Sequence, residues 1–496
     1  MKHKRNFFSR KTPFSAILSV ILILTVSMVI KAAAACRSLE GLPSTARYRQ
    51  AALSSEGLVP GTVYDRNGRV LARGKEDGTF ALAEESGPAL SRLLGAPLSA
   101  GAGVNAYTVL GSAMNLYGLD QPPFTLDRFL NGLLPDRKLK GGDLELTVDA
   151  SLSAFVYDLL EESGAAEAVC LVINYRTGEI HAAVSAHGIS ELPSALPEDG
   201  SLDNLPFKGT AMPGSSIKPI ILTALLEQDP SLKDRAYECT GSIIKDGVKI
   251  RCSHGVVHGH IENMEDGLAV SCNCYMIETS LGDGTDQKAL YEGMKAFGFD
   301  STDTIEGQLS YADPVFYGKN TDLEYLPSAE RVQARIGGAN ARSSAVGMAR
   351  AYMALFNEGI SPSPVLMKKR SVYAGGSLQE IPQGEDRRMC SPEAADLILP
   401  CMEAVTLKGT GTKMAVEGRR ICSKTGTGEY ADGTDENAVW AIAGVHPDDL
   451  QKGDEDAWLV LTCLDHYDLQ KGENSGNTAG RITGEVLRFL LSEETN

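Results

Sequence analysis

Two groups of β-prone segments, separated by a long helical middle, constrain the fold of this chain most strongly. The first group is a hairpin joined by the turn-like Tyr175-Arg176-Thr177-Gly178. Its strands span residues 168–174 and 179–185, and the second group spans residues 420–426, 438–445 and 457–464. Helical patterns occupy residues 345–357 and 392–405, and residues 482–491 are typical of an amphipathic helix. We therefore predict an α+β fold with one mixed, mainly antiparallel sheet flanked by helices.

Three short strings place reactive and polar side chains around this pattern. They are Ser215-Ser216-Ile217-Lys218, Ser271-Cys272-Asn273 and Lys424-Thr425-Gly426-Thr427. By chance alone, Ser-x-x-Lys is expected about twice in a chain of this length. A second copy does occur, at Ser242-Ile243-Ile244-Lys245. The strings therefore need support from their surroundings.

The surroundings distinguish the two Ser-x-x-Lys copies. Ser215 follows the turn Pro213-Gly214 and opens an apolar run that predicts a buried helix. Residues three apart lie on the same side of a helix, so Lys218 stands one turn from Ser215. Ser242 lies in a polar, turn-rich stretch that we interpret as a surface loop, and Ser475 has a similar setting. We therefore select Ser215.

The trio, in this order, resembles the motif set of penicillin-binding proteins and class A β-lactamases. Residues 213–219 look like the active-site string of penicillin-binding proteins, including both prolines. Residues 62–72 and 142–149 are similar to strings of the class B, monofunctional transpeptidase type. The chain departs from that pattern at Pro60, where arginine is usual, and at Gly337-Gly338-Ala339, where Gly-Gln-Gly is common. The overall resemblance is to a class B penicillin-binding protein.

This resemblance implies a function as well as a penicillin-binding/serine β-lactamase-like fold. The expected activity is that of a D,D-transpeptidase, which cross-links peptidoglycan stem peptides through a serine acyl-enzyme and needs no cofactor. The implied partners are stem peptides, β-lactams and a membrane glycosyltransferase of the cell-wall machinery. Two alternatives stay open: a D,D-carboxypeptidase or other penicillin-binding hydrolase, and a non-catalytic scaffold or β-lactam sensor.

The catalytic roles follow from the chemistry of the side chains together with the resemblance. A serine hydroxyl becomes a good nucleophile when a neighbouring base takes its proton. We assign Ser215 as the nucleophile and Lys218 as the base, and expect burial and the charge of Lys424 to lower the pKa of Lys218. In this arrangement Ser271 relays a proton towards the leaving amine. Asn273 holds the substrate amide or orients Lys218.

The third string is assigned to substrate binding. Lys424 supplies positive charge, and the hydroxyl groups of Thr425 and Thr427 bind a terminal carboxylate. Gly426 allows the substrate to lie against the strand. By family analogy, the backbone N–H groups of Ser215 and Thr427 form the oxyanion hole.

The N-terminus has the features of a membrane anchor. Residues 2–11 contain lysine and arginine but no acidic residue, and residues 14–30 carry no charge. That length is at the lower edge of a membrane span. We predict a basic cytoplasmic tail at residues 1–13 and a single-pass anchor at residues 14–35, with the catalytic domain outside the cell. A cleaved signal peptide and a lipid-modified Cys36 are the alternatives.

The remainder divides into two expected domains: a small N-terminal stalk at residues 36–145 and the transpeptidase domain at residues 146–496. The net charge of the chain is -17, and the tail is a basic, acid-free segment that holds five of the 47 lysine and arginine residues. No basic stripe of the size of a domain is left for phosphate contacts, which argues against nucleic acid as a partner.

The ten cysteines follow no regular spacing. Cys239 and Cys252 bracket a short loop and form the candidate disulfide, with free or buried thiols as the alternative. Cysteine and histidine crowd residues 252–274, but their spacing does not match a structural zinc pattern. We therefore predict no metal site, and interpret this segment as a loop beside the active site.

Overall fold

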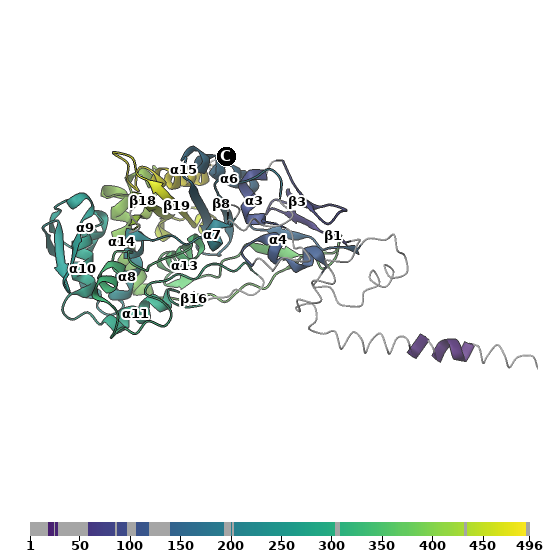
Figure 1. The fold of residues 1–496 in the computed structure, drawn as a ribbon, viewed down its shortest axis with the longest axis horizontal. Coiled ribbons are helices and arrows are strands. Elements are labelled where there is room, and N and C mark those ends of the chain that lie inside the picture. The colour runs from purple at the N-terminus through teal and green to yellow at the C-terminus, as the bar shows by residue number, and fades with distance from the viewer. Residues whose placement is uncertain are drawn as a thin grey trace, which may run out of the picture.

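The computed structural model describes the chain in ten ranges: residues 18–23, 25–27, 58–84, 87–96, 106–118, 139–192, 200, 203–302, 308–430 and 434–492. Two larger sheets, four two-stranded sheets and a set of helices make up this part of the chain (Figure 1). The smaller helical elements α9, α10 and α11 lie at one end of the molecule, and strands β1 and β3 lie towards the other.

The central sheet contains the five predicted strands, all antiparallel, in the order β17-β18-β19-β7-β8. Their bounds are β7 (Glu167–Asn174), β8 (Ile180–Ser185), β17 (Ile421–Glu429), β18 (Glu436–Val445) and β19 (Trp458–Asp468). The two groups of segments meet where β19 pairs with β7. The predicted α+β arrangement is therefore confirmed, and β17 is one edge of the sheet.

Helices cover both faces of this sheet, which explains why its strands are almost continuously apolar. Alternate residues of β7 belong to different cores: Cys170 and Val172 pack on one face, and Leu171 and Ile173 on the other. The first face is covered by α6 (Ala150–Glu162) and α15 (Ala479–Ser492), as Figure 1 shows. Helix α13 (Ala345–Phe356) packs on the second face, where all its residues are buried.

The site region is built by helices packed beyond that second face. They are α8 (Lys218–Leu226), α9 (Met264–Ala269), α10 (Asn273–Leu281), α11 (Gln287–Ala296), α12 (Ser328–Ala334) and α14 (Pro392–Lys408). Every residue of α8 is buried, as the apolar run after Ser215 predicts. Two small antiparallel pairs lie beside these helices: β9 (Tyr237–Cys239) with β12 (Gly259–Ile261), and β10 (Ser242–Lys245) with β11 (Val248–Arg251).

A second sheet forms around the first part of the described chain, in the order β15-β14-β6-β2-β3-β4. Its strands are β2 (Thr62–Tyr64), β3 (Val70–Gly74), β4 (Phe80–Leu82), β6 (Leu144–Leu146), β14 (Met367–Arg370) and β15 (Gln379–Glu380). Strands β2 and β3 are joined through Asn67 and Gly68, a dipeptide that favours tight hairpin turns. Because β14 pairs with β6, a segment far along the chain completes this sheet.

Short elements complete the architecture. They are α3 (Gly87–Leu94), α4 (Val109–Ser112), α7 (Leu205–Lys208), and the paired short strands β1 (Leu58–Val59) with β5 (Leu139–Lys140) and β13 (Ile360–Ser361) with β16 (Arg387–Arg388). None of the helices in the described part of the chain reaches the length and hydropathy of a membrane span. Most of the predicted anchor at residues 14–35, and Cys36, lie outside the described residues.

Candidate active site

Ser215 lies on a tight helical turn that leads directly into α8. Residues Gly214–Ile217 form a 3-10 helix, and the backbone N–H of Lys218 donates to the carbonyl oxygen of Ser215. In a 3-10 turn, side chains three residues apart are eclipsed. Ser215 and Lys218 therefore share one side of the turn, as the sequence predicts. Ser215 is half-buried, whereas the side chain of Lys218 is buried.

The edge strand β17 lies directly against this turn, at backbone distance. A Cβ atom on Gly426 would lie 2.6 Å from the backbone N of Ser216 and 2.6 Å from the carbonyl oxygen of Pro213. A Cβ atom on Gly214 would lie 2.3 Å from the carbonyl oxygen of Thr427. The side of Gly426 where a side chain would project is therefore packed against the Ser215 turn and does not contact the substrate. This corrects the reason given for that glycine from the sequence.

The Ser271-Cys272-Asn273 string forms the connection between α9 and α10. Ser271 has a φ of 53°, in the left-handed region that non-glycine residues rarely adopt. Such strain is found most often at functional sites, where the surrounding structure holds the residue in place. The N–H of Ser271 donates to the carbonyl oxygen of Leu268 at 3.0 Å, which anchors the strained residue to α9.

The three strings meet at the hydroxyl group of Ser271. Lys424 Nζ donates to Ser271 Oγ at 2.9 Å, and Lys218 Nζ lies 3.5 Å from the same atom. Lys218 Nζ also donates to the carbonyl oxygen of Ser271 at 2.8 Å and to Asn273 Oδ1 at 2.7 Å. One hydroxyl group therefore bridges the two lysines, and Asn273 orients Lys218. Of the two roles predicted for Asn273, these contacts favour the orientation of Lys218 over binding of the substrate amide.

Both lysines are buried, and their charged forms are correspondingly disfavoured. Burial lowers the pKa of Lys218 to about 8, although the thiols of Cys272, Cys252 and Cys274 act in the opposite direction. Burial, reinforced by the charge of Lys218, lowers the pKa of Lys424 well below its ordinary value. Two buried ammonium groups repel each other, so the pair favours a state in which one amine is neutral. A neutral amine beside a hydroxyl group is what proton abstraction requires.

The threonines of the third string differ in their surroundings. The hydroxyl groups of Thr425 and Thr410 lie 2.7 Å apart and form a hydrogen bond. Thr425 is buried, whereas Thr427 is half-buried. Within the described ranges β17 is an edge strand, so no other described strand pairs with its outward backbone groups. An extended peptide could bind along this edge by backbone hydrogen bonds, as in other cases of strand addition.

Gly337 also packs against the Ser215 turn, through the backbone of Gly214. Adding a side chain at Gly337 tests this contact. Gly337 has a φ of 76°, and a Cβ atom on it would lie 2.0 Å from the carbonyl oxygen of Gly214. We expect Gly337→Ala to lower the free energy of unfolding by about 2–4 kcal/mol, since it adds a clash to a strained conformation. Urea unfolding followed by circular dichroism measures this difference.

The matched control for that substitution is Gly298→Ala. Gly298 has a φ of 92°, but nothing lies within 4 Å of the position of its Cβ atom. The control therefore carries the conformational cost of a positive φ, on the order of 1 kcal/mol, without the clash. Equal losses in the two variants would show that the backbone of Gly214 does not press against Gly337.

The structure places three sequence assignments differently. Ser242 does not lie in a surface loop: it begins strand β10, which pairs with β11 from Ser242–Arg251 to Lys245–Val248. It remains apart from the three strings, none of whose hydrogen bonds it shares. The segment at residues 252–274, expected to be a loop beside the site, contains β12, α9 and the start of α10. Cys239 Sγ and Cys252 Sγ lie 3.7 Å apart and are not joined by a disulfide.

Other features of the site were not selected from the sequence. Thr410 and Gly337 have no site role assigned from the sequence, although Gly337 lies in the string that departs from the family pattern. Both contact the three strings through tertiary packing. The sulfur atoms of Cys239, Cys252, Cys272 and Cys274 converge next to the Ser271 connection. Because Cys272 lies inside the second string, the sequence does indicate that cysteines and catalytic residues share this region.

The family model for the penicillin-binding protein transpeptidase domain matches residues 168–484. Among curated proteins, the chain is 27% identical over 377 residues to the stage V sporulation protein D of Bacillus subtilis (strain 168). That match covers 71% of this chain and 54% of the relative, so the chain spans about half the length of the curated relatives it matches.

Solved structures show the same fold. Penicillin-binding protein 3 of Mycobacterium tuberculosis, in its apo form, matches with a TM-score of 0.72 and 19% sequence identity, over 88% of this chain and 97% of that one. The same protein complexed with ampicillin matches with a TM-score of 0.71 and 19% identity, over 88% and 96% of the two chains.

Proposed function

Because this chain belongs to the family of penicillin-binding protein transpeptidase domains, we propose that it is a serine D,D-transpeptidase that cross-links peptidoglycan stem peptides and is inhibited by β-lactams. One observation carries this proposal more than any other. Lys218 and Lys424 both reach the hydroxyl group of Ser271, beside the turn that bears Ser215. The arrangement provides a nucleophile, a base and a path for the proton.

The first half of the reaction forms the acyl-enzyme. Neutral Lys218 takes the proton of Ser215, and Ser215 Oγ bonds to the carbonyl carbon of the penultimate D-alanine. The C–N bond to the terminal D-alanine then breaks, and the leaving amine receives a proton through Ser271, which contacts both lysines. In the second half, an amine of a neighbouring stem attacks the ester and restores the hydroxyl group of Ser215.

Backbone donors and the third string hold the substrate in this scheme. The N–H groups of Ser215 and Thr427 stabilise the developing oxyanion, a role worth about 3–4 kcal/mol per donor in comparable sites. The half-buried Thr427, at the sheet edge, is the better placed of the two threonines to reach a substrate carboxylate. The hydroxyl group of Thr425 is held by Thr410, so its role is to position the strand.

Product analysis tests the proposal against the hydrolases of the same family. The purified full-length chain is incubated with peptidoglycan polymer bearing pentapeptide stems, with and without penicillin, and the digested products are analysed by mass spectrometry. We expect penicillin-sensitive peptide dimers. Monomers shortened by one D-alanine, without dimers, would indicate a carboxypeptidase instead. Unchanged stems in every reaction would support a non-catalytic scaffold or sensor.

The proposal extends to where the enzyme acts. Residues 1–13 form the cytoplasmic tail, residues 14–35 the membrane anchor, residues 36–145 the stalk and residues 146–496 the transpeptidase domain outside the cell. Its support is the basic, acid-free start of the chain and the charge-free residues 14–30. Such a placement brings the site to its stem-peptide substrate, next to a membrane glycosyltransferase as partner.

A further inference from the structure

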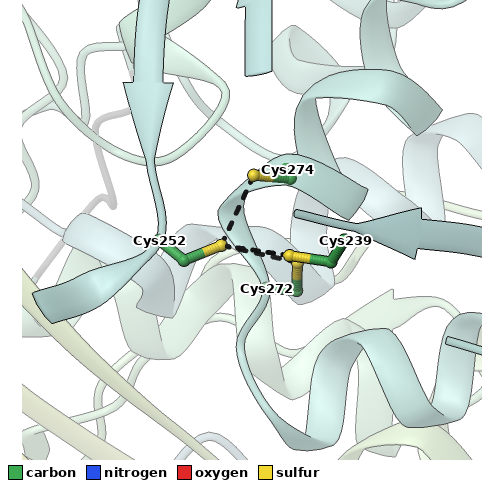
Figure 2. A group of neighbouring side chains, drawn as sticks. All are labelled: Cys239, Cys252, Cys272 and Cys274. Atoms are coloured by element: carbon green, nitrogen blue, oxygen red, sulfur yellow. Dashed lines mark hydrogen bonds between the residues drawn. The ribbon is translucent and has the colours of Figure 1, made fainter. Parts of the chain in front are cut away.

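Four cysteine side chains, from two strand ends and the start of one helix, converge beside the catalytic connection (Figure 2). Cys239 ends strand β9, Cys252 follows strand β11, Cys272 caps the N-terminus of α10, and Cys274 lies in the first turn of that helix. All four are buried, and their sulfur atoms all lie within 4.8 Å of one another. No other group of three or more potential metal ligands was found in the described ranges.

The distances between the sulfur atoms distinguish a metal site from disulfides. Cys252 Sγ lies 3.7 Å from the sulfur of Cys239, 3.6 Å from that of Cys272 and 3.5 Å from that of Cys274. A disulfide would bring two sulfur atoms to about 2.05 Å. Four thiolates bound tetrahedrally at about 2.3 Å from a zinc ion lie about 3.8 Å apart. The three distances from Cys252 therefore fit the edges of a zinc–thiolate tetrahedron, and the other distances between these sulfur atoms do not exceed 4.8 Å.

Hydrogen-bond donors lie next to two of these sulfur atoms, as they do around metal-bound thiolates. The backbone N–H of Tyr275 donates to Cys272 Sγ at 3.3 Å, and His258 Nδ1 lies 3.5 Å from Cys239 Sγ. Donors of this kind orient the ligands of metal sites. A set of four soft sulfur ligands selects zinc over magnesium or calcium, which prefer oxygen. With four protein ligands, such a site is closed and structural.

We infer that Cys239, Cys252, Cys272 and Cys274 bind a zinc ion that holds the catalytic connection in place. Two of the ligands, Cys272 and Cys274, flank Asn273, the residue that orients Lys218. The strained Ser271 directly precedes Cys272. Asn273 Nδ2 in turn donates to the carbonyl oxygen of Arg251, next to Cys252. The metal thus ties β9 and β11 to the residues that contact Lys218.

Metal analysis of the full-length chain tests the site without reference to activity. Protein purified under reducing conditions, without added metal, is analysed by mass spectrometry for metals. We expect about one zinc ion per chain in the wild type, and a loss of roughly tenfold or more in Cys252→Ser. The matched control is Cys390→Ser, since Cys390 is also buried but lies outside the group; it should retain the metal.

Cobalt substitution keeps the inference testable if Cys252→Ser fails to fold. Wild-type protein is stripped with a chelator and refilled with cobalt, whose tetrahedral thiolate complexes give intense absorption in the visible range and sulfur-to-cobalt charge-transfer bands. Appearance of both, and their displacement by zinc, is the expected result. A wild type without bound zinc, or peptide maps showing these cysteines paired in disulfides, would overturn the inference.

The effect on catalysis rests on the proposed function and is measured separately. Removing zinc should slow penicillin acylation of Ser215 by at least roughly tenfold, because Asn273 and Ser271 lose their support, and added zinc should restore the rate. If the metal is present but its removal leaves acylation unchanged, the site binds zinc without positioning the catalytic residues. If holo-protein is never acylated, the proposed function fails while the metal site stands.

Discussion

Ser215→Ala abolishes covalent labelling of the chain by a fluorescent penicillin. The substitution removes the one atom that forms the acyl bond, and the water that could replace it leaves no covalent adduct. The turn itself should survive, since it is held by backbone contacts with β17 and by the Lys218 N–H bond to the Ser215 carbonyl. Labelling is measured on denaturing gels, and peptide mapping of the wild type should place the label on Ser215.

The matched control is Ser242→Ala, which changes the serine of the other Ser-x-x-Lys copy. Ser242 begins strand β10 and takes no part in the hydrogen bonds that join the three strings, so this variant should label like the wild type. Thermal unfolding of both variants checks that they are folded. A folded Ser215→Ala chain that still labels at another serine would rule out Ser215 as the nucleophile.

The sheet could be predicted because burial on both faces leaves a strong signal in the sequence. In β7, every residue after Glu167 is buried, and in β18 all eight residues from Ala438 on are buried. Such continuous apolar runs, bounded by polar turns, identify central strands without knowledge of their partners. The order of the strands needed the tertiary structure, because β19 pairs with a strand from the other group.

The Ser215 turn could be predicted for a similar reason, whereas Ser242 was misread. Pro213 and Gly214 mark a turn, and the run after Lys218 is buried in full. The polar, turn-rich stretch around Ser242 includes Asp246-Gly247. Both residues have positive φ values and connect β10 to β11, which makes them a tight hairpin turn. Asp-Gly between two short strands is itself a hairpin signal.

The cysteine group could not be found from local spacing. Zinc motifs are recognised when ligand pairs lie close together in the sequence. Here Cys239 and Cys252 are brought together by the pairing of β9 with β12 and of β10 with β11. Cys272 and Cys274 reach them only because α10 packs on the same strands. The same limit applies to Gly337, whose contact with Gly214 depends on how α12 is connected to α13.

Lys218→Met should lower the rate of penicillin acylation by about 10²–10⁴-fold, the usual contribution of a general base. Methionine approximates the length of the buried lysine chain but cannot accept the proton of Ser215. The substitution also leaves the Ser271 carbonyl and Asn273 Oδ1 without their donor. The control is Lys245→Met, in the second Ser-x-x-Lys copy, whose amine lies 3.9 Å from Glu278 at the surface of the hairpin. It should acylate at the wild-type rate.

The pH dependence separates a catalytic from a structural role of Lys218. With a pKa of about 8, only about a tenth of the Lys218 amines are neutral at pH 7, so acylation of the wild type should rise roughly tenfold towards pH 9. The groups facing this amine are Lys424, whose own pKa is lowered by burial and by the charge of Lys218, and the thiols of Cys252, Cys272 and Cys274, which favour the charged form of Lys218. Stopped-flow acylation rates between pH 6 and pH 9 measure the profile.

Lys218→Met should be slow and lack this rise, because it has no proton to lose there. A variant that is slow but keeps the wild-type profile would show that Lys218 only holds Ser271 and Asn273 in place, and that another group is the base.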